Sequence, residues 1–181
     1  MEFCDTVILK DGRECVIRNG VFEDGKAVLE NYILTHRQTE NLLAYADETD
    51  RTVEDESEWL DSMKNSPVEI QLLAFVGGYL AGMAGANSIG RRIKLRHRAS
   101  LGVSVDEGYW GLGIGRALLE RCIICAKNAG YEQLELDVVS DNDRALSLYE
   151  HLGFKEWGRN PKAFKTRDGR YQELIAMRLE L

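Results

Sequence analysis

The sequence predicts an α/β domain in which a mixed, mostly antiparallel sheet is flanked by helices on both faces. Two patterns lead to this fold class. The apolar segments 69–76 and 79–86 are separated only by Gly77 and Gly78, which is typical of a β-hairpin. Beyond residue 100, a strand, a glycine-rich loop, a helix, a strand and a second helix follow one another. At 181 residues and 44% hydrophobic composition, the whole chain (1–181) is expected to be one domain.

The N-terminal half is predicted to contain a strand and two helices. The strand lies around residues 15–17, and Asp24 is expected to cap a helix with apolar residues at helical spacing up to Ile33. Thr52 followed by Asp55 resembles a capping box for the second helix. The segment 47–61 holds eight acidic residues. We interpret it as a solvated helix start, with an acidic rim for a cationic partner as the alternative.

A basic segment follows the predicted hairpin. Residues 91–98 contain five Arg or Lys, and a strand is predicted over roughly 95–105. On a strand, Arg92, Lys94, Arg96 and Arg98 would share one face, because side chains alternate. Solvent is the expected neighbour of that face, and a charged substrate or cofactor phosphate is the alternative.

The C-terminal half is predicted in more detail. A strand ends at residue 105, and the helix after the glycine-rich loop is expected to end at Gly130. The strand over 131–139 leads into a helix for which Ser140 and Asp143 suggest a second capping box. Gly153 ends that helix, and two further strands are joined by a turn at 167–170.

Charge and composition limit the classes of partner. With 23 basic and 30 acidic residues the net charge is −7, which argues against a nucleic-acid partner. No apolar stretch is long enough to cross a membrane and no signal pattern is present, so we expect a cytoplasmic protein. Cys122 and Cys125 share a helix face without a second pair, and the histidines are scattered, so no metal is expected.

The segment YWGLGIGRALL, residues 109–119, indicates an anion site. Glycines 111, 113 and 115 open a helix after a strand, where free N–H groups and the helix dipole favour a phosphate. A P-loop requires GxxxxGK[ST], and these glycines are too closely spaced for it. A dinucleotide fingerprint requires GxGxxG, but position 116 is Arg. The pyrophosphate of coenzyme A remains.

Two motifs resemble the GNAT N-acetyltransferase superfamily. WGLGIG, residues 110–115, is similar to the family's [R/Q]xxGx[G/A] signature, and SDNDRALSLYEHLGF, residues 140–154, is similar to its later Asn-and-Tyr helix. Trp110 departs from the Arg or Gln of the signature, for which we expect weakening at most. The resemblance implies a GNAT-type sheet with splayed central parallel strands and acetyl-CoA as cosubstrate. The cofactor-binding residues that we take from it, or from the loop itself, are Val103, Ser104, Val105, Trp110, Gly111, Leu112, Gly113, Ile114, Gly115, Arg116 and Asn142.

The resemblance also suggests a mechanism. It places the thioester between the strand ending at Val105 and the strand around 136–139, and Tyr149 is our candidate general acid. Asn142 and Tyr149 are seven residues apart, so two helical turns place them on one face, and core packing is the alternative role for Tyr149. Among acids near the predicted strands, neither Glu69, Glu107 nor Asp137 is singled out as the base.

The predicted function is acetyl transfer from acetyl-CoA to a primary amine of a small molecule or peptide. A non-catalytic acyl-CoA-binding sensor is the main alternative, and a Rossmann-type nucleotide-binding protein is a remote one. The acceptor is not readable from the sequence, although the acidic composition weakly favours a cation. A homodimer is possible through the C-terminal strands.

Overall fold

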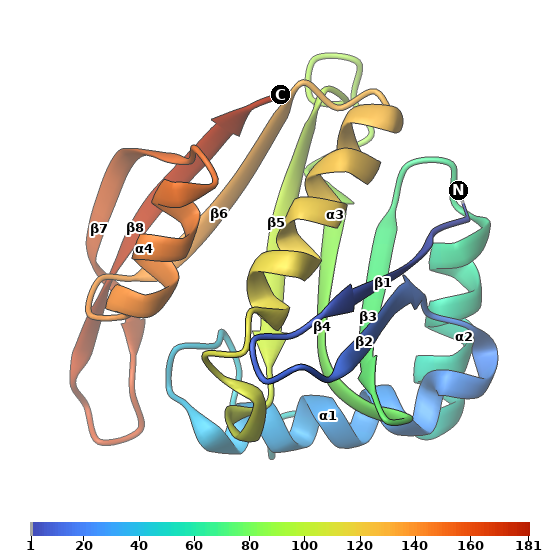
Figure 1. The fold of residues 1–181 in the computed structure, drawn as a ribbon. Helices are drawn as coiled ribbons and strands as arrows, with labels where there is room; N and C mark the ends of the chain where they lie inside the picture. The colour runs from blue at the N-terminus through green and yellow to red at the C-terminus, as the bar shows by residue number, and fades with distance from the viewer. Residues whose placement is uncertain (1) are drawn as a thin grey trace.

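The computed structural model describes residues 2–181 and contains one eight-stranded sheet (Figure 1). Its strand order is β1-β2-β3-β4-β5-β6-β8-β7, so only the last two strands depart from chain order. The strands are β1 (Cys4–Ile8), β2 (Glu14–Asn19), β3 (Ile70–Val76), β4 (Tyr79–Ser88), β5 (Arg98–Val105), β6 (Gln133–Val139), β7 (Lys155–Lys165) and β8 (Tyr171–Glu180). Strand β1 is an addition that the sequence analysis did not predict.

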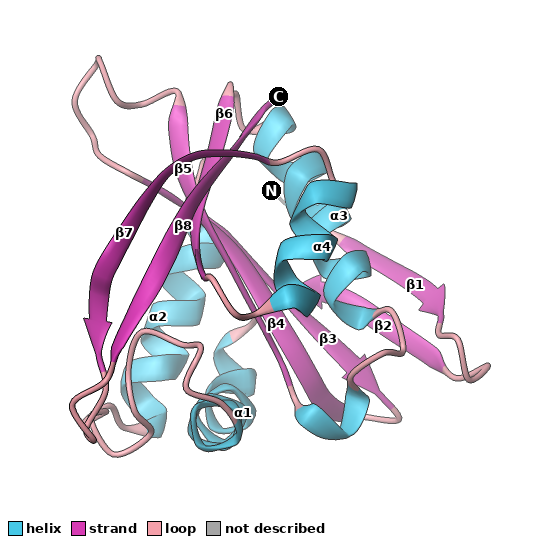
Figure 2. Cartoon of the chain, turned by 90° about the vertical axis from the view of Figure 1, so that its left-hand side faces the viewer, coloured by secondary structure: helices cyan, strands magenta, loops and turns pink. Residues whose placement is uncertain are grey.

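Helices cover both faces of the sheet, as predicted (Figure 2). Helices α1 (Gly25–Gln38) and α2 (Val53–Asn65) pack on one face, over β4 and β3 respectively. Helix α3 (Ile114–Asn128) packs on the opposite face, on the same side as α4 (Asp143–His151). Two short 3-10 helices, η1 (Phe22–Asp24) and η2 (Glu107–Tyr109), precede α1 and the glycine loop.

The pairing of β5 with β6 interrupts an otherwise antiparallel sheet. These two strands run parallel and pair only over Arg98–Gln133, Ala99–Leu134 and Ser100–Glu135. Beyond that point β5 continues to pair with β4, and β6 continues to pair with β8. The two strands therefore separate toward their C-terminal ends, so the predicted parallel and splayed central pair is confirmed.

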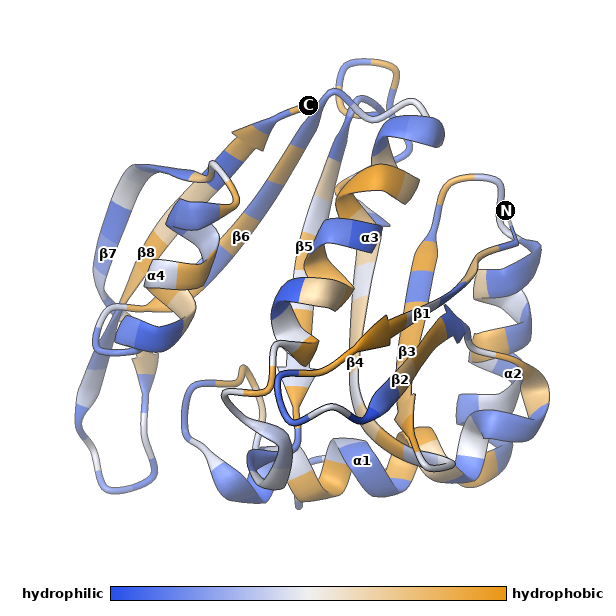
Figure 3. Cartoon of the chain, viewed as in Figure 1, coloured by the Kyte–Doolittle hydropathy of each residue, from blue (hydrophilic) through white to orange (hydrophobic). Residues whose placement is uncertain are grey.

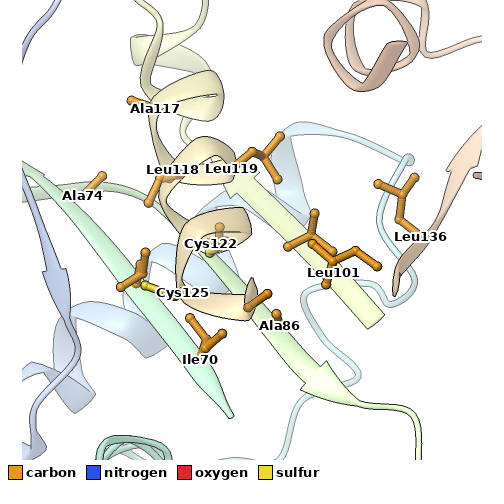
Figure 4. Packing of buried hydrophobic residues seen from close by; sticks show 14 of the residues in the cluster. Ile70, Ala74, Ala86, Leu101, Ala117, Leu118, Leu119, Cys122, Cys125 and Leu136 are labelled. Carbon is orange, nitrogen blue, oxygen red and sulfur yellow. The ribbon is translucent and has the colours of Figure 1, made fainter. Parts of the chain in front are cut away.

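The main core lies between the sheet and α3. Hydrophobic and hydrophilic residues alternate along β6 and β8, because successive side chains point to opposite faces (Figure 3). Leu118, Leu119, Cys122 and Cys125 lie buried against strand residues such as Ile70 (Figure 4). The two cysteines are thus free thiols in the core, and burial raises the pKa of both.

Residues 91–97 of the basic segment are not on a strand, which corrects the sequence analysis. Strand β5 begins at Arg98, and the preceding residues form turns in which the N–H groups of Leu95 and Arg96 donate to the Arg92 carbonyl. Because β4 and β5 are antiparallel neighbours, the chain must reverse direction between them. Of the basic residues, Arg98 alone lies in the strand, where it forms a bidentate ion pair with Glu135.

The predicted helix caps are right in one case and wrong in two. Thr52 and Asp55 form the expected capping box at α2. Asp24 precedes α1, but its carboxylate accepts hydrogen bonds from Arg18 and from the Val21 N–H instead of capping. At α4 the cap is Asn142, whose Oδ1 accepts from the Ala145 N–H, so the predicted Ser140–Asp143 box is wrong.

Candidate functional site

The glycine loop begins from a rigid anchor at the end of β5. Asp106 is buried, and its carboxylate accepts hydrogen bonds from Gln38 of α1, from Tyr79 of β4 and from the Gly108 N–H. Burial by itself raises the pKa of Asp106, but these three hydrogen bonds outweigh it and lower the pKa below its usual value. The carboxylate therefore stays ionised at neutral pH and ties the loop to two other elements.

Two of the three loop glycines are required by backbone conformation. Gly111 has φ +79° and Gly113 has φ +98°, a left-handed region that residues with a Cβ rarely adopt. Gly115 is different, because a Cβ there would make ordinary contacts of 3.6 Å with Leu148 and 3.7 Å with Val105. The sequence analysis assigned all three glycines to an anion site, whereas Gly111 and Gly113 first of all allow the turn into α3.

The loop presents a run of unpaired amides at the start of α3. Within the described chain, residues 2–181, the N–H groups of residues 111–116 donate no hydrogen bond, and the first helical bond runs from Ala117 to the Gly113 carbonyl. Ile114 is 1% exposed and packs into the core, so it anchors the loop from within. The Leu112 carbonyl accepts from the Lys10 N–H, which fixes the loop against the β1–β2 turn. This arrangement suits an anion.

Trp110 takes the place of the family's Arg or Gln with a different set of contacts. Its indole Nε1 donates to the Val105 carbonyl at 2.7 Å, which closes the loop onto the end of β5. The Arg144 guanidinium from α4 lies over the Trp110 ring, 4.3 Å from its centre. Arg116 instead points along α3 and pairs with Glu120. The cation nearest to Trp110 thus comes from a helix that the signature does not include.

Between the splayed strands, one edge of each strand has no strand partner. Val103, Ser104 and Val105 pair with Ala84, Met83 and Gly82 of β4, but not with β6. Residues 136–139 likewise pair with β8 alone. Backbone N–H and C=O groups along these facing edges are available to a ligand that enters between the strands.

Tyr149 lies on α4 and belongs to the main core. It is 8% exposed, its ring meets Phe154 edge-on, and burial raises its pKa to about 12. Its hydroxyl has no hydrogen-bond partner within residues 2–181, so packing does not use the polar end of the side chain. The sequence analysis placed Asn142 and Tyr149 on one helix, whereas Asn142 lies just before α4 as its N-cap. Its Oδ1 accepts a hydrogen bond from the Ala145 N–H in that cap.

The three acids weighed as a general base lie in different surroundings. Glu69 accepts a hydrogen bond from the Ser88 N–H at the C-terminal end of β4. This end of the sheet is opposite to the glycine loop, so Glu69 is excluded as the general base. Glu107 lies in η2, where its N–H donates to Gln38. Asp137 is exposed on β6 at the splay. Among residues 2–181, no group of three His, Cys, Asp or Glu could hold a metal ion, and no helix is long and apolar enough to cross a membrane.

A contact between the loop 39–52 and the β7–β8 turn was missed by sequence reasoning. Arg167 pairs with Asp47 through two hydrogen bonds and lies over the Tyr45 ring, while Arg170 pairs with Glu40. Asp47 thus belongs to an ion pair, not to an open acidic rim. Residues about 120 apart make these contacts, so no local pattern indicates them.

Comparison with known proteins decides the family. The model of the acetyltransferase (GNAT) family matches residues 33–154. The chain belongs to the GNAT family. The match covers both motifs that carried the resemblance and extends into α1.

Individual GNAT proteins resemble this chain in sequence and in fold. The [ribosomal protein bS18]-alanine N-acetyltransferase of Escherichia coli K12 is 40% identical over 73 residues, covering 40% of this chain and 49% of that protein. The chain thus spans about half the length of the curated relatives that it matches first. The GNAT acetyltransferase from Streptococcus pneumoniae superposes with a TM-score of 0.89 at 26% identity, covering 92% and 99% of the two chains. The fold is shared with yncA from Salmonella typhimurium, solved with its cofactor acetyl-CoA (TM-score 0.82, 23% identity, 92% and 94% covered).

Proposed function

We propose that this protein is an N-acetyltransferase that transfers the acetyl group of acetyl-CoA to a primary amine of a small molecule or peptide. The observation that carries the proposal is the run of unpaired amides at residues 111–116, directly beside two central strands with unpaired edges. An anionic group at the loop and an extended arm between the strands are what acetyl-CoA requires. Membership of the GNAT family supports the same reaction.

From the glycine loop to the gap between β5 and β6, successive residues suit successive parts of acetyl-CoA. In the proposal, the amides of Gly111 to Arg116 hold the pyrophosphate, with Trp110 and Ile114 fixing the loop. The free edge formed by Val103, Ser104 and Val105 then binds the pantetheine arm, and Asn142 borders it from the cap of α4. When bound, acetyl-CoA supplies an activated acyl group whose transfer to an amine releases a thiol.

Tyr149 is proposed as the general acid that protonates the departing thiolate. With a pKa near 12, the phenol keeps its proton across the neutral range, so it is in the form that an acid requires. Its hydroxyl is free to donate within the described part of the chain. The acceptor amine must lose a proton before it attacks, and we assign no residue to that step.

The test is thiol release from acetyl-CoA over a panel of polyamines, aminoglycosides, amino acids and short peptides. We expect one class to accelerate release well above the rate with water alone, which would establish a transferase and name its acceptor. Calorimetric titration of acetyl-CoA is run in parallel. Binding without acceleration by any amine would support a non-catalytic sensor, and the absence of binding would overturn the proposal.

A further inference from the structure

The loop between β4 and β5, residues 89–97, takes no part in the site described above, and we name it the basic tip. Arg91, Arg92, Lys94 and Arg96 lie in it with exposed side chains. Within residues 2–181 they make no ion pair and no side-chain hydrogen bond, whereas ten other arginines are in ion pairs. Contacts inside the described chain therefore do not explain why these cations are gathered in one loop.

The backbone of the basic tip is tied down, so the positions from which these side chains project are fixed. The N–H groups of Leu95 and Arg96 donate to the Arg92 carbonyl at 2.8 and 3.1 Å, which forms a single helical turn. Residues four apart in such a turn are neighbours, so Arg92 and Arg96 lie on one side of it, where like charges repel. The His97 carbonyl accepts from the Gln133 N–H at the start of β6. An external anion would relieve the repulsion that this backbone maintains.

The basic tip also exposes an apolar side chain among its cations. Ile93 is 78% exposed and lies between Arg92 and Lys94 in the sequence. The same loop does cover an apolar side chain elsewhere, since Leu95 is half-buried and a Cβ on Gly90 would lie 3.0 Å from its Cδ1. Cations around an exposed apolar side chain are the combination that holds a protein at the interface of an anionic membrane.

The basic tip lies at the end of the sheet opposite to the glycine loop. It precedes the N-terminal end of β5, the glycine loop follows the C-terminal end, and the eight residues of β5 span about 25 Å. Figures 1 and 2 show the tip projecting beyond the ends of its two strands. A cofactor phosphate at the glycine loop, the alternative weighed for this basic segment, is therefore too far away. A ligand of the tip is separate from the proposed acetyl-CoA site.

We infer that the basic tip docks the protein on an anionic lipid surface, with Ile93 among the headgroups and the surrounding cations on lipid phosphates and carboxylates. A nucleic acid suits the tip less well, because a phosphate backbone makes no use of an apolar side chain and the tip has no Phe, Tyr or Trp to stack on bases. A stable protein interface takes about 20–30 residues a side, more than the tip offers. A small projecting loop suits a flat surface.

The distribution of charge gives the docked protein one orientation. The chain without the tip is more acidic than its net charge of −7, so an anionic surface repels it. Screening at physiological salt limits charge interactions to about 8 Å, so the projecting tip is attracted while the acidic remainder stays out of range. Each Lys or Arg near such a surface strengthens binding roughly fivefold, so docking is reversible and sensitive to salt.

Sedimentation of the full chain with lipid vesicles tests the inference. Vesicles of phosphatidylcholine with roughly 30% phosphatidylserine are compared with pure phosphatidylcholine, which has no net charge. We expect binding to the anionic vesicles alone, and loss of that binding at roughly 0.5 M salt. Arg92→Gln combined with Arg96→Gln removes two cations and should weaken binding about 25-fold. Ile93→Gln keeps the charge and should weaken binding about fivefold or more.

Matched control variants remove the same groups from other surfaces. Lys162→Gln combined with Lys165→Gln removes two exposed cations of β7 that make no ion pair within residues 2–181. Ile8→Gln replaces an isoleucine of β1 that is 67% exposed. Vesicle binding by both controls should stay within about twofold of the wild type. The substituted side chains of the tip are exposed, so the tip variants should keep the Tm and the calorimetric Kd of CoA of the wild type.

The outcomes separate lipid from other polyanions. Absence of binding to the anionic vesicles would overturn the inference, as would an equal loss of binding in the tip variants and the control variants. A single-stranded RNA and poly-glutamate are titrated in the same buffer. Binding to either of them without binding to vesicles would assign the tip to a nucleic acid or to an acidic protein instead. Because the tip is remote from the glycine loop, a failure of acetyl transfer would leave these outcomes unchanged.

Discussion

The two faces of the splayed sheet are built in different ways. On the α3 face, the glycine loop is one continuous segment in which backbone conformation, free amides and the buried Ile114 all come from neighbouring residues. On the α1–α2 face, strand register brings together Gln71, Gly85 and Gly102 from three strands. A local segment can be recognised as a motif, whereas neighbours on separate strands are set only by register.

Because they are built differently, the two faces of the sheet are suited to different roles. The glycine loop offers donors to an anion in a geometry that many acetyltransferases would share, so it suits a common cosubstrate. Substitutions on one face should therefore leave the other face working, and the following predictions test that separation.

The largest effect is expected from Gly113→Val. Gly113 has φ +98°, so a β-branched residue would force the loop out of its conformation and misplace several amides. Losing two charge-assisted hydrogen bonds should weaken CoA binding about 1000-fold, measured by calorimetry. Gly115→Ala is the control, since a Cβ there makes ordinary contacts, and its Kd should change less than threefold. Retained CoA affinity in a folded Gly113→Val protein would show that the loop does not bind the cofactor.

Tyr149→Phe should lower turnover without affecting cofactor binding. Removing a general acid typically reduces the rate about 100-fold, while the ring and its contact with Phe154 remain. Since the pKa of Tyr149 is about 12, the acid form persists through alkaline pH, so wild-type turnover should show no loss from this group below pH 10. Single-turnover kinetics over pH 6–10 checks both statements. Equal kcat in the variant would eliminate the acid role.

Asp106→Ala should affect both faces moderately, because Asp106 links α1, β4 and the start of the glycine loop. Losing a buried, ionised acceptor of three hydrogen bonds should lower the free energy of unfolding by about 2 kcal/mol, measured in urea. We expect CoA affinity to fall about tenfold as the loop loosens, which is 1.4 kcal/mol.

The same residue gives a pH dependence with a definite sign. The pKa of Asp106 is lower in the folded chain than in the unfolded one, so its contribution is complete above the unfolded value, about 3.9, and disappears as pH falls through the folded value. Asp106→Ala should therefore be closer to the wild type in stability at pH 3 than at pH 7. An equal difference at both pH values would contradict this assignment.

The smallest effect is expected from Trp110→Gln, which introduces a residue of the family signature. The indole closes the loop onto Val105 and lies against Arg144, but the anion donors are backbone amides that the substitution leaves in place. We expect the Kd of CoA to change less than threefold by calorimetry. A tenfold change would mean that the Trp110–Arg144 stack belongs to the cofactor site.

Sequence reasoning was reliable where neighbouring residues control the outcome. The β3–β4 hairpin, the capping box at Thr52, the helix ends at Gly130 and Gly153 and the glycine loop follow from local conformational preferences. It was wrong where competing local partners exist. Asp24 prefers the Arg18 guanidinium to the helix it precedes, and Asn142 displaces Ser140 as a cap.

The amino-acid order alone was sufficient for the fold class, the family motifs and the candidate cofactor loop, because each depends on residues within about ten positions of one another. The separation of β5 from β6, the free hydroxyl of buried Tyr149 and the pairing of Arg167 with Asp47 required the folded chain. So did the position of the Gln71 carboxamide over Gly85. These features depend on which distant strands become neighbours and in what register, and no short segment carries that information.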